Sequence, residues 1–170
     1  MARISYSDLR DPAVAPLVAR IERERGRVIN LYRMLLQSPP VAEGWLAFLT
    51  AIRQKCSLSG RDRELVIMHI AVINGADYEF RAHVPFALRE GITQAQIDAL
   101  REGNLQPFDA RERDVLAYCE SMTRDIHVPD TVFQAVRPHY SERELVELTA
   151  TIAAYNLVSR FLEALQIDHD

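Results

Sequence analysis

The chain has no long hydrophobic run, few cysteines and no excess of basic residues, and each absence excludes a class of protein. No stretch reaches the ~18 uninterrupted apolar residues that a membrane span requires. Two cysteines, Cys56 and Cys119, are too few for a disulfide scaffold and favour a reducing compartment. A net charge of −4 lacks the basic excess of a sequence-independent nucleic-acid binder. These observations predict a cytoplasmic protein with no nucleic-acid partner and no membrane partner.

Glycine and proline are also scarce, at 6 and 8 of 170 residues, which argues against a fibrous or linker-rich protein. The N-terminal stretch MARISYSDLRDP lacks the apolar core of a secretory signal. The 48% hydrophobic and 26% charged residues are typical of a globular domain that can bury a core. We therefore expect residues 1–10 to form an N-terminal arm and residues 11–170 to form one domain.

The pattern of the chain is helical almost throughout, because the period-two alternation of strands is nearly absent. Pro39 and Pro40 are typical of a helix start, and Gly91 is typical of a helix end. Four pairs have the spacing of an N-cap and its reciprocal partner: Ser59 with Asp62, Thr93 with Gln96, Asp109 with Glu112, and Ser141 with Glu144. The sequence predicts an all-α bundle with helices near 13–25, 29–37, 40–55, 60–74, 76–90, 93–102, 109–124, 129–137 and 141–165.

Two features bear on how these helices assemble. The tetrapeptide RELV at residues 63–66 recurs at residues 143–146, which indicates either two related helical halves or two helices that are capped alike. The predicted helix over residues 141–165 carries apolar residues around much of its circumference, more than one core stripe needs. That surplus favours burial against a second subunit, although a central helix of the monomer explains it equally well.

The residues of chemical interest lie between Glu64 and His83. A break over residues 74–77 lets the second helix fold back on the first, so that Glu64 could approach it. Glu79 and His83 are four residues apart, share one helix face and could form a hydrogen bond. A carboxylate beside an imidazole fixes the tautomer and raises the imidazole pKa, as a general acid–base at neutral pH requires. The alternative is a solvated pair that stabilises its helix by roughly a few tenths of a kcal/mol.

Other polar groups support less specific predictions. His69 could join Glu79 and His83 as a metal site, but the spacing is no zinc signature, and a core histidine is the simpler interpretation. Arg160 could bind a carboxylate or form an ion pair at a subunit contact. The two cysteines are better explained as small buried residues than as nucleophiles. No glycine-rich phosphate loop and no nucleophile elbow are present, so we expect neither a metal nor a cofactor.

Several short segments follow one another in an order that is typical of one family. They are NLYR at 30–33, SP at 38–39, LS at 58–59, REL at 63–65, YEF at 78–80 followed by His83, and GIT at 91–93. The chain resembles the carboxymuconolactone decarboxylase and alkylhydroperoxidase-D superfamily through these segments. Residues 144–148, 155–156 and Arg160 resemble its longer branch. The resemblance implies an all-helical fold and a homo-oligomer, either a trimer or a hexamer.

The hydroperoxidase branch of that superfamily uses a glutamate, two cysteines separated by two residues, and a histidine. The resemblance places the glutamate on Glu64 and the histidine on His83, but the cysteine positions fall on Ala76 and Glu79. Without a thiolate there is no attack on a peroxide and no resolving disulfide. Redox chemistry of that type is therefore disfavoured, and it would require the two cysteines elsewhere in the chain to meet.

The decarboxylase branch also lacks the dithiol and resembles this chain at Glu79-x3-His83. Its reaction type, loss of carbon dioxide beside an unsaturated lactone, needs proton delivery and enolate stabilisation but no cofactor. The resemblance implies His83 as the proton donor, Glu79 as the residue that orients it, and Glu64 as a relay. Tyr78 or Asn74 would bind the enolate oxygen. We expect a carboxy-lyase-like enzyme for a small unsaturated or keto carboxylate; a non-catalytic helical oligomer is the remaining alternative.

Overall fold

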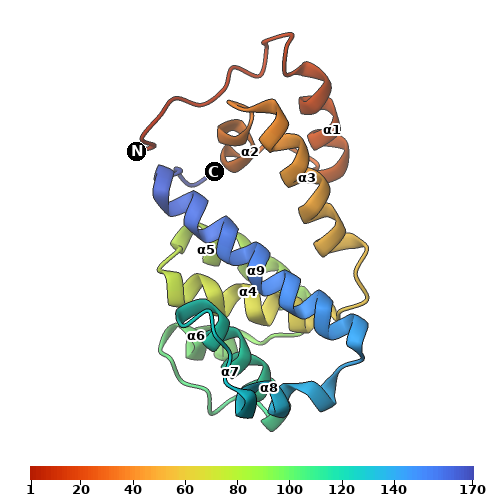
Figure 1. The fold of residues 1–170 in the computed structure, drawn as a ribbon. Helices are drawn as coiled ribbons and strands as arrows, with labels where there is room; N and C mark the ends of the chain where they lie inside the picture. The colour runs from red at the N-terminus through yellow and green to blue at the C-terminus, as the bar shows by residue number, and fades with distance from the viewer. The chain divides into compact units, whose positions relative to one another are not determined.

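The structure is a computed structural model that describes residues 1–170, with nine α-helices and no strand. The all-α prediction is confirmed, and every observed helix begins and ends within two residues of its predicted bounds. The chain divides into two compact units, residues 1–55 with 162–170 and residues 56–161, whose helices are labelled in Figure 1.

The first unit contains three helices. Its helices are α1 (Ala15–Arg25), α2 (Asn30–Leu35) and α3 (Pro39–Gln54). Pro39 occupies the first position of α3, where its missing N–H and fixed φ are tolerated. The N-terminal residues are held in this unit, because the Ser7 N–H donates to the Arg33 carbonyl and the Tyr6 hydroxyl donates to Asp168 Oδ2 at 3.0 Å.

The second unit contains the larger part of the core. Its helices are α4 (Gly60–Asn74), α5 (Asp77–Arg89), α6 (Gln94–Arg101), α7 (Ala110–Arg124), α8 (Asp130–Val136) and most of α9 (Glu142–Leu165), with a 3-10 turn at Arg137–His139. All four predicted N-caps form, because the side-chain oxygens of Ser59, Thr93, Asp109 and Ser141 each accept the backbone N–H three residues later. The local capping chemistry therefore determines where these helices begin.

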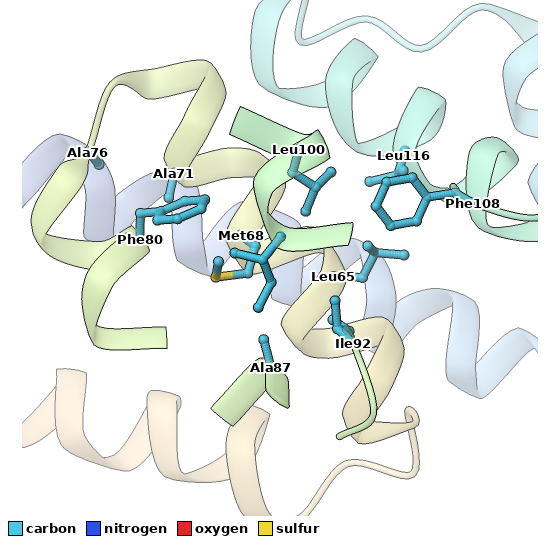
Figure 2. Packing of buried hydrophobic residues seen from close by; sticks show 11 residues of the cluster. Leu65, Met68, Ala71, Ala76, Phe80, Ala87, Ile92, Leu100, Phe108 and Leu116 are labelled. Atoms are coloured by element: carbon cyan, nitrogen blue, oxygen red, sulfur yellow. The ribbon is translucent and has the colours of Figure 1, made fainter. Parts of the chain in front are cut away.

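Helix α4 is the central helix of the second unit and packs mainly on α5 and α7. A helix that is apolar around its circumference must be covered on every side, and residues 64–71 of α4 are all buried. Figure 2 shows Leu65, Met68 and Ala71 of α4 beside Phe80 of α5 and Leu116 of α7. Each large apolar side chain buried in this cluster contributes roughly 2 kcal/mol.

An ion pair between buried Asp62 and half-buried Arg111 joins the first turn of α4 to α7. Arg111 donates one hydrogen bond to each carboxylate oxygen of Asp62 and a third, at 3.0 Å, to the Tyr140 hydroxyl. Burial alone would raise the pKa of Asp62, but the Arg111 hydrogen bonds hold it below its ordinary value. Because every polar group is satisfied, this cluster stabilises the packing and offers no proton to a reaction.

Helix α9 has one face in the core and one apolar face outside it. Leu148, Ile152 and Tyr155 are buried, whereas Val146 and Leu157 are 68% and 47% exposed. Val146 and Leu157 are eleven residues apart and so lie on the same face of the helix. This exposed stripe agrees with the surplus read from the sequence, and the homo-oligomer stays a prediction. None of the helices has both the length and the apolar character that crossing a bilayer requires.

Candidate active site

The turn between α4 and α5 brings the candidate residues together. Gly75 ends α4 with a φ of +66°, in the left-handed region that glycine adopts without strain. The following N–H, of Ala76, donates back to the Ala71 carbonyl at 2.8 Å, which closes the end of α4. Helix α5 then runs back along α4, with which it makes extensive contact. Residues in the first turns of α4 can therefore meet residues in the middle of α5.

The central interaction is a hydrogen bond between Glu64 of α4 and His83 of α5. His83 Nδ1 lies 2.6 Å from Glu64 Oε2, and the two residues are only 6% and 1% exposed. Arg63 donates to the other carboxylate oxygen, Oε1, at 3.2 Å, which favours the ionised form of Glu64. A carboxylate that accepts from Nδ1–H fixes the imidazole tautomer and makes Nε2 the nitrogen that exchanges protons. This arrangement is suited to acid–base chemistry.

Aromatic rings hold the imidazole in place. The Tyr155 ring of α9 meets the His83 ring edge-on, with 5.2 Å between centroids and an interplanar angle of 87°. The Phe86 ring, one turn further along α5, lies 5.5 Å from His83 in a tilted arrangement. These contacts restrict the ring to one orientation, so its hydrogen bond to Glu64 is kept without a further loss of side-chain entropy.

Glu79 is buried beside α9, where Ser159 donates to its Oε2 at 2.5 Å. The same Ser159 hydroxyl also lies 2.7 Å from the Tyr155 carbonyl. The Ser159 hydroxyl is shared between these two acceptors and holds the Glu79 carboxyl in a water-poor site.

A second polar network lies on the neighbouring face of α9. Asn74 Nδ2 donates to Asn156 Oδ1 at 3.1 Å, and Arg160 Nη1 donates to the same oxygen at 2.6 Å. Asn156 Nδ2 in turn donates to Thr123 Oγ1 at 3.0 Å and to the Ile152 carbonyl at 3.1 Å. The network ties the end of α4 to α7 and α9 through one amide.

The structure brings the predicted residues to one part of the second unit but distributes their contacts differently. The sequence analysis expected Glu79 as the carboxylate hydrogen-bonded to His83, and the structure has Glu64 in that role. Four-residue spacing places Glu79 and His83 on one face of α5, but Nδ1 points across to the facing helix. Tyr78 is buried in the first turn of α5, and Asn74 is half-buried at the end of α4.

Ser159 was not predicted as a site residue, nor were Tyr155 and Asn156. The sequence carried one signal that could have found them, since residues 155 and 159 are four apart and share a face of α9. Nothing in the sequence specifies which acidic residue that face would meet. The packing of α9 against α5 determines that Glu79 is the acidic residue that Ser159 contacts.

His69 is a second buried imidazole, on the face of α4 that packs against α7. It is 7% exposed, neither ring nitrogen has a hydrogen-bond partner, and its Nε2 lies 4.0 Å from Glu120 Oε2. Burial lowers the pKa of His69 from its ordinary value to about 4. The structure gathers no three His, Cys, Asp or Glu side chains that could hold a metal ion. His69 is therefore a neutral core histidine at physiological pH.

The two cysteines are free thiols in unreactive surroundings. Cys119 is fully buried and its Sγ donates to the Val66 carbonyl at 3.7 Å. Burial raises the pKa of the Cys119 thiol, and burial together with the nearby Glu147 raises that of Cys56. A thiol that stays protonated is a poor nucleophile.

A hollow of about 220 Å³ opens beside the α4–α5 turn. Arg101 lines it, with its guanidinium 4.2 Å from the centroid of the Phe80 ring and a hydrogen bond to Asp77 at 3.1 Å. Its lining is Ala71, Val72, Gly75, Asp77, Phe80 and Arg101. None of the candidate acid–base residues lines this hollow, so it carries no part of the site described above.

Known proteins that are similar in sequence or structure indicate a family for this chain. A model of the carboxymuconolactone decarboxylase family matches residues 39–121. YdfG of Bacillus subtilis (strain 168), an uncharacterised protein, is 28% identical over 110 residues, which cover 63% of this chain and 75% of YdfG. An uncharacterised peroxidase-related protein from Ralstonia eutropha JMP134, with an alkylhydroperoxidase core, superposes with a TM-score of 0.85 at 18% identity, over 99% of this chain and 92% of that one.

Residues 39–121 therefore match the carboxymuconolactone decarboxylase family, and the chain has the fold of alkylhydroperoxidase-D-like proteins. A variant of the debrominase Bmp8, solved with 2,3,4-tribromopyrrole, superposes with a TM-score of 0.81 at 18% identity, over 100% of this chain and 94% of that one. At this identity the likeness is one of fold. The family match includes Glu64, Glu79 and His83, whereas α9, with Ser159 and Arg160, lies beyond the matched residues.

Proposed function

We propose that the chain is a cofactor-independent acid–base enzyme that acts on a small unsaturated or keto carboxylate, by decarboxylation or by proton transfer at carbon. The observation that carries the proposal is the buried 2.6 Å hydrogen bond between His83 Nδ1 and Glu64 Oε2. An imidazole with a carboxylate on one nitrogen can exchange protons through the other, and general acid–base groups of this kind contribute about 10²- to 10⁴-fold to a rate.

In the decarboxylation, the bond between the carboxylate and its carbon breaks and carbon dioxide leaves. The electron pair of that bond moves into the conjugated carbonyl and gives a dienolate. Nε2–H of the His83 imidazolium then delivers a proton to carbon, which returns the electrons from oxygen and leaves a neutral imidazole. Water protonates the imidazole again. Glu64 stabilises the imidazolium, because a carboxylate at hydrogen-bond distance favours the charged ring.

The remaining predicted residues have supporting roles. Glu79, held by Ser159, is a second acid that could protonate or polarise the carbonyl oxygen on which charge develops. Tyr78 and Asn74 offer a hydroxyl and an amide as donors to the enolate oxygen. These roles need no metal, because each neutralises charge with a proton or a hydrogen bond.

Thiol-based peroxidase chemistry receives no support from the cysteines. Cys119 lies inside the packing of α4 and α7, and the thiol pKa values of Cys119 and Cys56 are both raised. Attack on a peroxide requires an exposed thiolate and a resolving thiol within reach. The acid–base proposal does not depend on either cysteine.

The test is a screen of unsaturated lactone carboxylates and 2-keto acids, followed by proton NMR in D2O for loss of carbon dioxide and for exchange of carbon-bound protons. We expect His83→Asn to lower the rate on any true substrate by 10²- to 10⁴-fold. His69→Asn is the matched control, since it removes an equally buried imidazole that has no hydrogen-bond partner.

Circular dichroism must show that both variants keep the helical fold. Full activity of folded His83→Asn would exclude the proposed mechanism. A panel on which the native protein neither releases carbon dioxide nor exchanges protons would favour the non-catalytic helical module instead.

A further inference from the structure

We propose that Arg160, held by Asn156, forms a carboxylate-binding subsite beside the acid–base residues and receives the carboxylate of a small-molecule ligand. The inference deepens the function proposed above and rests on it for the identity of the ligand class. It is carried by a polar network that positions a guanidinium and leaves its charge without a partner.

The side-chain amide of Asn156 orients Arg160, and all of its hydrogen-bonding groups have partners. Its Oδ1 accepts from Asn74 Nδ2 and Arg160 Nη1, and its Nδ2 donates to Thr123 Oγ1 and the Ile152 carbonyl. A buried amide whose donors and acceptors are all used has one orientation. Asn156 is 8% exposed, so this orientation is also enforced by packing.

Asn156 contacts the guanidinium of Arg160 on one side only, at Nη1. Its Nη1 donates to Asn156 Oδ1 at 2.6 Å and to the Asn156 carbonyl at 3.2 Å, which uses both protons of that nitrogen. The edge formed by Nε and Nη2 takes part in neither bond. Two parallel N–H groups on that edge match the two oxygens of a carboxylate in a bidentate pair.

The charge of Arg160 is not neutralised within the chain. Most arginines of the second unit form ion pairs, such as Arg111 with Asp62, Arg61 with Glu112 and Arg124 with Glu120. Arg160 is exposed to solvent and forms no ion pair. A guanidinium that is fixed in orientation but keeps its charge binds an anion with little loss of side-chain entropy, as a binding site requires.

Arg160 follows the acid–base contacts along α9, on the neighbouring face of the helix. Tyr155 and Ser159, which contact His83 and Glu79, each precede a member of this network by one residue on α9. Asn74, at the start of the α4–α5 turn, is also part of the network. The ligand carboxylate would be held at Arg160 while its carbon skeleton extends towards His83 and Glu79.

The test measures binding and needs no turnover. Sodium fumarate is titrated at constant ionic strength into the native protein and into Arg160→Gln, with dimethyl fumarate as the uncharged probe. We expect Arg160→Gln to raise the fumarate Kd at least tenfold, and dimethyl fumarate to bind the two proteins alike. Arg124→Gln, which removes an ion-paired arginine on α7, should leave the fumarate Kd unchanged.

A fumarate Kd that is the same in native protein and Arg160→Gln would overturn the subsite, as would an equal increase in Arg124→Gln. If Arg160→Gln does not fold, Arg160→Lys, which keeps the charge but loses the bidentate edge, should raise the Kd severalfold. The Nε–H NMR signal of Arg160 in native protein should also shift with fumarate, and an unmoved signal would again exclude the subsite.

Failure of the subsite and failure of the enzymatic function give different results. In the His83→Asn background, Arg160→Gln should still weaken fumarate binding, even though His83→Asn cannot turn over a substrate. Fumarate binding that depends on Arg160, without turnover of any carboxylate, would support the subsite and contradict the proposed enzymatic function. Turnover by Arg160→Gln with an unchanged KM would support the enzymatic function and contradict the subsite.

Discussion

Two imidazoles of the second unit are buried to the same degree but differ in their surroundings. His83 on α5 is 6% exposed and lies 2.6 Å from the Glu64 carboxylate, while His69 on α4 is 7% exposed and has no hydrogen-bond partner on either nitrogen. The carboxylate closest to His69, on Glu120, is 4.0 Å away and 43% exposed. Burial is therefore common to both rings, and the hydrogen-bonded carboxylate of Glu64 is the charged group that distinguishes His83 from His69.

The comparison shows which feature makes a buried histidine chemically useful. Desolvation alone disfavours the charged ring, and His69 accordingly has its pKa lowered to about 4. A carboxylate at hydrogen-bond distance opposes desolvation and fixes which nitrogen carries the proton. Burial in an apolar helix is shared by both residues, so burial alone does not identify the reactive one.

The largest effect that tests the comparison is the acid sensitivity contributed by His69. The pKa of His69 is about 4 in the folded chain and 6.5 ordinarily, so between these pH values the unfolded chain binds a proton and the folded chain does not. The free energy of unfolding therefore has its full value above pH 6.5. It falls by about 3 kcal/mol as the pH is lowered to 4. Urea unfolding of native protein and His69→Leu at pH 7 and pH 4 measures the difference. Parallel pH profiles for the two proteins would contradict this account of His69.

A smaller effect is expected when the carboxylate of the other pair is neutralised. Glu64→Gln keeps the shape and the oxygen that Arg63 contacts but turns a charge-assisted hydrogen bond into a neutral one. We expect the free energy of unfolding at pH 7 to fall by about 1 kcal/mol. The low-field NMR proton of His83 Nδ1 should move upfield in the same variant. An unchanged signal would mean that Glu64 does not accept from this nitrogen.

The smallest expected effect concerns the distant carboxylate of Glu120. Its charge raises the pKa of His69 against the larger desolvation effect. Glu120→Gln should lower that pKa a little further and deepen the stability loss between pH 7 and pH 4 by roughly 0.3 kcal/mol, because solvent screens the exposed charge. Urea unfolding in low salt and in 1 M NaCl measures it. A loss as large as 1 kcal/mol would show that Glu120 is a true partner of His69, and the contrast with His83 would fail.

The helices themselves were predictable because their signals are local. The caps at Ser59, Thr93, Asp109 and Ser141 satisfy backbone N–H groups three residues away, so both partners are visible in a short stretch of sequence. The left-handed Gly75 and Gly91 end their helices for the same kind of reason, since only glycine adopts a positive φ readily. No long-range contact has to be known for either inference.

The contacts within the candidate site were predictable only in part. Glu64, Glu79 and His83 were identified from residue type and order, but the partner of His83 was assigned to its own helix. Hydrogen bonds between Ser159 and Glu79, and between Asn74 and Asn156, join residues that are 80 and 82 positions apart. Such pairs depend on how α9 rotates against α4 and α5, which is set by packing of the whole core.

Residue order alone determined the helical architecture, the turn at Gly75 and the supply of ionisable groups between residues 64 and 83, because helix periods, caps and turns act over a few residues. Tertiary packing decided that Glu64 rather than Glu79 receives the His83 hydrogen bond, that His69 stays without a partner, and that Asn156 orients Arg160. These outcomes depend on the directions of side chains across helix interfaces, where a rotation of one helix by part of a turn exchanges one partner for another.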